Sequence, residues 1–309
     1  MTMTQYLLLI YTLIILACNN PNKNSDLIKE STVKDTITNV MPEIVYSNDT
    51  FSRDSVRHYS QLKNNSKSVL TVHVFVPLCD NENQGIVPVA PHLGDGSDLV
   101  KNLYWGAGHG MKSYFKYSNN WELLESEIYN NDTILERCVF RKKTASGLKI
   151  LLVADAYKGD KMKTCLQDYL SCLAGKNKET IIIDKDTILI KSDADMLCFS
   201  GHNGLMDMDI EPVKTVDGIK REGVVISCYS GYYFNRFFRA AQAYPLVFTS
   251  GLLYPGAFIL DDVISSWATG KSRNECRIAA GESYNRIMKC GRQAGINLFL
   301  SGWSGYDHL

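Results

Sequence analysis

The sequence carries no excess of charge of either sign, since 33 Lys and Arg residues balance 33 Asp and Glu residues. No block of basic residues interrupts this balance. Proteins that bind nucleic acid present a basic patch or stripe, so we expect no nucleic-acid partner. The 309 residues, 45% of them hydrophobic, suffice for one sizeable globular domain with short additions.

Closely spaced cysteine pairs are also missing. None of the nine cysteines forms a C-x-x-C motif, so we expect no structural metal site. Most of the cysteines stand inside apolar segments, where a buried free thiol is the ordinary expectation. Cys165 and Cys172 would lie roughly 10 Å apart on one helix, which is beyond the reach of a disulfide.

The N-terminal apolar run, 6–17, is too short for the roughly 20 residues that span a bilayer, but it suits the core of a signal peptide. It ends in Ile-Leu-Ala-Cys at Cys18, which resembles the lipobox of bacterial lipoproteins. This resemblance implies a signal peptide over 1–18, lipidation of Cys18 and a membrane-anchored protein of the cell envelope, in the periplasm or on the outer surface. A plain signal peptide is the alternative. The polar stretch 19–66 is typical of a flexible linker, which leaves 67–309 for the domain.

Short apolar segments alternate with helical patterns through the domain. Strands are expected at 68–78, 148–154, 196–200, 224–228 and 246–250, and helices at 160–174, 232–243 and 257–290, the last broken near Gly270. Continuous apolar runs of this length are typical of strands buried on both faces of a parallel sheet. The sequence therefore predicts an α/β fold, a three-layer α/β/α sandwich around a mostly parallel central sheet.

Polar residues follow four of these strands. In chain order they are Asp80, Asn81 and Gln84, then Asp155, then His202, and finally Cys228. Ligands of open α/β sheets bind at the carboxyl ends of the strands. His202 and Cys228 would lie side by side there if their strands are neighbours.

A thiol and an imidazole in this position can form a catalytic dyad. Cys228 precedes a helix expected to begin near Tyr232, and the partial positive charge of a helix N-terminus lowers the pKa of a thiol. His202 would act as general acid and base. The backbone N–H groups of Cys228 and of Gly204 or Asn203 are the candidate oxyanion donors.

This arrangement resembles the peptidase clan that includes caspases, metacaspases, legumain, gingipains and separase. Ser-Cys-Tyr-Ser-Gly at 227–231 is similar to the Cys-x-Ser-Gly run of metacaspases. The clan usually has Gly directly after the histidine and Ala before the cysteine, where this chain has Asn203 and Ser227. The resemblance implies a caspase-like domain, a His202 and Cys228 dyad, and no metal or organic cofactor.

Several further side chains are candidates for supporting roles. Asp207 and Asp155 could orient the dyad. The substrate side chain before the scissile bond could be recognised by Asp80, Asn81 and Gln84. Asp80 would suit a basic side chain. Alternatively, this loop hydrogen-bonds itself, as Asn, Asp and Gly do in turns.

The sequence thus predicts a cysteine endopeptidase that hydrolyses protein or peptide substrates through a thioacyl-enzyme. One alternative is an inactive caspase-like lipoprotein that binds a peptide or small ligand at the same place, since fold alone does not fix function. Another is a different acyl-transfer enzyme that uses the same thiol. No internal repeat or heptad pattern indicates an oligomeric state.

Overall fold

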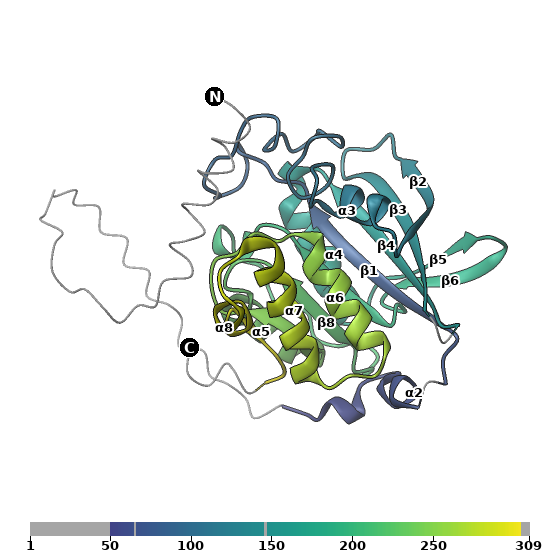
Figure 1. Ribbon diagram of the computed structural model, residues 1–309. Coiled ribbons are helices and arrows are strands. Elements are labelled where there is room, and N and C mark those ends of the chain that lie inside the picture. The colour runs from purple at the N-terminus through teal and green to yellow at the C-terminus, as the bar shows by residue number, and fades with distance from the viewer. Residues whose placement is uncertain (1–49, 65, 145–146, 304–309) are drawn as a thin grey trace, which may run out of the picture. The chain divides into compact units, whose positions relative to one another are not determined.

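An eight-stranded mixed sheet organises the computed structural model, which describes residues 50–64, 66–144 and 147–303 (Figure 1). The strand order is β10-β9-β8-β7-β1-β4-β3-β2. The five central strands are parallel: β9 (Tyr244–Thr249), β8 (Glu222–Ile226), β7 (Met196–Ser200), β1 (Val69–Pro77) and β4 (Lys149–Tyr157). The edge strands are antiparallel to their neighbours: β10 (Phe299–Leu300), β3 (Ile134–Lys143) and β2 (Glu122–Ile128). The prediction of an α/β fold with a mostly parallel sheet is confirmed.

The four longest helices of the described chain pack in two pairs beside the sheet. Their bounds are α3 (Met111–Tyr117), α4 (Met162–Leu173), α5 (Ser230–Ala241), α6 (Ala257–Ala268), α7 (Arg273–Met288) and α8 (Arg292–Asn297), with the short turns η2 (Gly159–Lys161) and η3 (Gly204–Met206). Helix α4 contacts β1, β7 and α5, whereas α6 contacts α7 (Figure 1). The predicted helix 257–290 is divided at Gly270, whose positive φ of 70° ends α6 and lets the chain turn back.

The folded part begins earlier than the sequence suggested. Residues assigned to the linker form η1 (Arg53–Ser55) and α2 (Tyr59–Lys63), and both lie in the same compact unit as the sheet. The reason is an ion pair, since Arg53 Nε donates to Glu222 Oε1 at 2.5 Å inside the protein. Trp267 Nε1 donates to the other carboxylate oxygen at 2.8 Å. The signal peptide, Cys18 and the linker up to residue 49 lie outside the described residues.

A hairpin covers one part of the sheet and carries a buried ionic network. It consists of β5 (Lys178–Ile183) and β6 (Asp186–Lys191), and its apolar side chains pack against β3 and β4. Beneath it Asp155 is fully buried and accepts hydrogen bonds from Arg137 Nε at 2.6 Å and Nη2 at 2.8 Å. His73 Nδ1 accepts from the backbone N–H of Lys191, so the ring proton lies on Nε2 and is donated to Asp155 at 3.0 Å.

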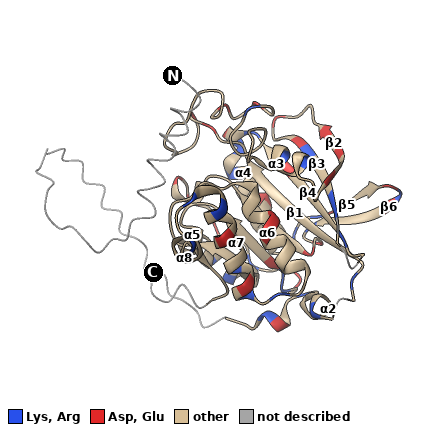
Figure 2. Cartoon of the chain, viewed as in Figure 1, with Lys and Arg blue, Asp and Glu red and all other residues tan. Residues whose placement is uncertain are grey.

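Asp155 therefore belongs to the interior of β4. The prediction that it follows the strand was wrong, because β4 continues to Tyr157. Its partners are structural, so Asp155 does not orient His202. Elsewhere charges of both signs are interspersed along the chain, as the balanced composition requires (Figure 2).

This network predicts a loss of stability in acid. Burial opposes ionisation of Asp155, but the hydrogen bonds and charges of Arg137 and His73 outweigh it and hold the pKa of the carboxyl well below its ordinary value. A lowered folded-state pKa stabilises the protein above the unfolded pKa of about 3.9, and this contribution is lost as the pH falls further. Urea unfolding between pH 7 and pH 3 should therefore show the advantage of the wild type over Asp155→Asn shrinking below about pH 4. A difference that stays constant with pH would contradict this account.

Candidate functional site

His202 and Cys228 follow adjacent parallel strands at matching positions. Ser200 of β7 pairs with Ile226 of β8, and two residues further along each chain come His202 and Cys228. The turn between β7 and His202 requires glycine, because a Cβ on Gly201 would lie 2.9 Å from Cγ of Pro77. The two side chains thus start from the carboxyl edge of the sheet, where ligands bind in open α/β folds.

Asp207 holds the imidazole of His202. The turn η3 brings the chain back so that Asp207 Oδ2 lies 2.6 Å from His202 Nε2. The same carboxylate accepts from the backbone N–H of Gly85, in the loop after β1, at 3.0 Å. An ionised carboxylate can only accept a hydrogen bond, so Nε2 of His202 carries the ring proton. The unprotonated Nδ1 is then the nitrogen that can accept a proton from the thiol. The contact is compatible with the orienting role that the sequence predicts for Asp207, which stays a prediction.

Asn203 ties the two strand ends together. Its side-chain Nδ2 donates to the backbone carbonyl of Cys228 at 2.7 Å, and its Oδ1 accepts from the N–H of Leu205 at 3.2 Å. The side chain is fully buried and both of its polar ends are bonded. A glycine could not make this link, which gives a physical reason for Asn203 beside His202. The N–H of Gly204 donates to the carbonyl of His202 at 3.2 Å, so Asn203 and Cys228 are the remaining oxyanion candidates.

The thiol of Cys228 is partly enclosed. Helix α5 begins at Ser230, closer to Cys228 than expected, after Tyr229 in the left-handed region at φ 50°. The sulfur donates to the carbonyl of Leu253 at 3.7 Å. Burial raises the pKa of the thiol, in contrast to the lowering expected from the helix N-terminus. Among the described residues, no hydrogen bond joins this sulfur to His202.

A second group of side chains lies beside the thiol. Tyr104 is buried and hydrogen-bonds the thiol of Cys79, and its phenol lies near Cys228. Burial raises the pKa of Tyr104, so the phenol stays protonated. The neighbouring Trp105 instead fills the core and donates to Glu136 at 2.7 Å. Loop residues such as Tyr104 carry no sequence signal for this placement, so sequence reasoning could not assign it.

The polar side chains of the loop after β1 form hydrogen bonds mainly with the backbone of this loop and of its neighbours. Asp80 accepts from the N–H groups of Glu82 at 2.9 Å and Asn83 at 3.1 Å. Asn81 exchanges two hydrogen bonds with the backbone of Val89. Gln84 Nε2 donates to two backbone carbonyls, those of residues 78 and 159. These bonds favour the alternative in which the loop stabilises its own turns over a role in reading the substrate.

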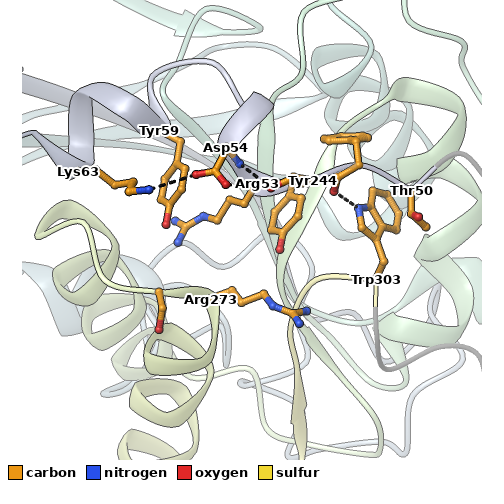
Figure 3. A pocket seen from close by; sticks show the side chains of 11 residues that line it. Thr50, Arg53, Asp54, Tyr59, Lys63, Tyr244, Arg273 and Trp303 are labelled. Atoms are coloured by element: carbon orange, nitrogen blue, oxygen red, sulfur yellow. Dashed lines mark hydrogen bonds and ion pairs between the residues drawn. The ribbon is translucent and has the colours of Figure 1, made fainter.

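Two hollows in the described part of the chain lie away from the dyad. One, of about 470 Å³, is bordered by the N-terminal segment, Tyr244 at the start of β9, and Arg273 at the start of α7 (Figure 3). Trp303 closes it and donates from Nε1 to the carbonyl of Phe51 at 3.1 Å. A second, of about 540 Å³, lies under the β5–β6 hairpin. Neither is lined by His202 or Cys228.

Other observations limit what the site can hold. No group of three or more His, Cys, Asp or Glu side chains is placed to bind a metal ion within the part of the chain that the structure describes. Over the same residues, no helix is long and apolar enough to cross a membrane. Comparison with protein-family models, curated proteins and solved structures gives no match, so the site is interpreted from its own geometry.

Proposed function

We propose that the protein is a cysteine endopeptidase with a caspase-like, three-layer domain, in which Cys228 is the nucleophile and His202 the general acid and base. The observation that carries this proposal is that both residues follow adjacent parallel strands while Asp207 holds the ring of His202 at 2.6 Å. The pairing of α4 with α5, and of α6 with α7, supports the proposed layers on either face of the sheet.

The reaction needs His202 as a base, because burial keeps the Cys228 thiol protonated at neutral pH. Nδ1 of His202 takes the proton as the sulfur attacks the carbonyl carbon of the scissile bond. The N–H groups of Cys228 and Asn203 stabilise the oxyanion. His202 then gives the proton to the leaving amine, which departs and leaves a thioacyl-enzyme. Water activated by His202 hydrolyses this thioester, and the thiol and the carboxylic acid are released.

An inactive, ligand-binding protein is the second candidate, and the raised pKa of Cys228 favours it. In that case the same edge of the sheet would bind a peptide or small ligand without cleaving it. For both candidates we propose a cell-envelope protein anchored through a lipid on Cys18, as the N-terminal sequence suggests.

Thiol labelling separates these candidates. Iodoacetamide treatment of the folded protein, followed by peptide mass mapping, should modify Cys228 at least about tenfold more slowly in His202→Ala than in the wild type. Cys290 is the matched control, because it is the other described cysteine that is not buried.

Two outcomes would count against the enzyme. Labelling of Cys228 at the rate of Cys290, or labelling that does not change in His202→Ala, would mean that the dyad does not activate the thiol. In the expected outcome, denaturation abolishes the difference between Cys228 and Cys290, because the activation depends on the folded geometry.

A further inference from the structure

Exposed apolar side chains gather around the dyad. Tyr229, directly after Cys228, is 39% exposed, and Leu252 is 49% exposed. Leu252 precedes Leu253, whose carbonyl accepts from the sulfur of Cys228, and the N–H of Tyr229 donates to the carbonyl of Gly251 at 2.9 Å. These contacts bring the two exposed side chains to the β8 and β9 side of the thiol.

The opposite side of the dyad has the same character. Met206 is 42% exposed and precedes Asp207, which bonds His202. Val87 is 64% exposed and stands two residues from Gly85, whose N–H bonds Asp207. Four of the ten large hydrophobic side chains exposed in the described part of the chain therefore belong to segments that contact the dyad or Asp207. Exposed apolar side chains grouped around a site make it a candidate binding surface.

The carboxylates of Asp80 and Asp207 are already hydrogen-bonded within the protein. The carboxylate of Asp80 is buried and bonded within its own loop, and that of Asp207 is bonded to His202 and Gly85. Along α5 the first charged side chain is Arg236, which faces Asp209 at 3.9 Å. A charged substrate side chain would thus find neither of these two buried or bonded carboxylates free to act as its ionic partner.

We propose that the side chain preceding the scissile bond is aromatic or aliphatic, and that Leu252 and Met206 select it. This inference rests on the proposed dyad of His202 and Cys228. It replaces the expectation of a basic side chain recognised by Asp80. Contact with Leu252 and Met206 would favour an apolar side chain by the area it removes from water.

Peptidyl acyloxymethyl ketones test this preference without requiring turnover. Three probes, identical except for Leu, Lys or Asp at the position before the ketone, are compared by their rates of alkylating Cys228, measured by intact mass. The Leu probe should react at least about tenfold faster than the Lys and Asp probes. Leu252→Lys should reduce this ratio to near one, and Met206→Lys should reduce it in the same direction.

Val216→Lys is the matched control. Val216 is 58% exposed but bonds Ala174 near the amino end of β8, away from Cys228, so its replacement should leave the ratio unchanged. Faster reaction of the Lys or Asp probe would overturn the inference while leaving the dyad intact, and so would equal rates for all three. If neither the ketones nor iodoacetamide labels Cys228 selectively, the proposed function fails together with the inference.

Discussion

Arg137→Ala is expected to lower the free energy of unfolding by about 3–5 kcal/mol, because it removes the main partner of a buried carboxylate. Asp155 is fully buried and takes two of its three hydrogen bonds from Arg137. Arg137 also pairs with Glu179 of the β5–β6 hairpin. The variant would therefore leave a charge inside the sheet with only His73 beside it. Urea unfolding followed by circular dichroism measures the loss.

Arg141→Ala provides the matched control on the same strand. Arg141 pairs with Glu122 and Asp184, whose side chains are 57% and 66% exposed. Surface ion pairs contribute about 0–1 kcal/mol, so this variant should unfold near the wild-type midpoint. Equal losses in Arg137→Ala and Arg141→Ala would show that burial of the Asp155 network does not govern its contribution.

Cys228→Ala is expected to reduce peptide hydrolysis to background, because no thioacyl-enzyme can form without the sulfur. His202→Ala should lower kcat by about 10²–10⁴, the usual contribution of a general acid and base. Asp207→Asn should retain more activity than His202→Ala, since the imidazole itself remains in place. The substrate is the fastest-cleaved peptide from a library digest, and rates are followed by mass spectrometry.

Cys290→Ala should leave these rates unchanged, because Cys290 lies outside the site. Thermal unfolding of each variant shows whether a loss of activity reflects chemistry or folding. Hydrolysis that persists in Cys228→Ala would assign the activity to another residue or to a contaminant.

The ends of the strands before His202 and Cys228 could be predicted from the sequence. The strands before His202 and Cys228 are buried on both faces, so they appear as continuous apolar runs whose ends are sharp. The break near Gly270 was predicted from a different signal, a glycine within a helical pattern. The signal of the apolar runs failed at Asp155, because a fully paired ionic group can lie inside a strand and resemble the residue that ends it.

Other parts of the fold could not be predicted because their stabilising contacts are distant in sequence. Strand β2 is mostly exposed and rich in Glu, which is typical of a protected sheet edge but also of a loop. Residues 50–64 appeared to be linker because their apolar content is low. They fold because Arg53 forms an ion pair with Glu222 and because Tyr59 and Leu62 become buried. The link from Asn203 to Cys228 likewise depends on the pairing of β7 with β8.

The ion pair between Arg53 and Glu222 also determines where a mechanical load would enter the domain. Glu222 begins β8, and Cys228 lies just beyond the other end of this strand. A pull on Thr50 would therefore reach the amino-terminal end of β8, whereas Cys228 lies six residues further along, or about 20 Å of extended chain. Force applied at the start of the described chain would thus act at one edge of the sheet, and the thiol lies at the opposite edge.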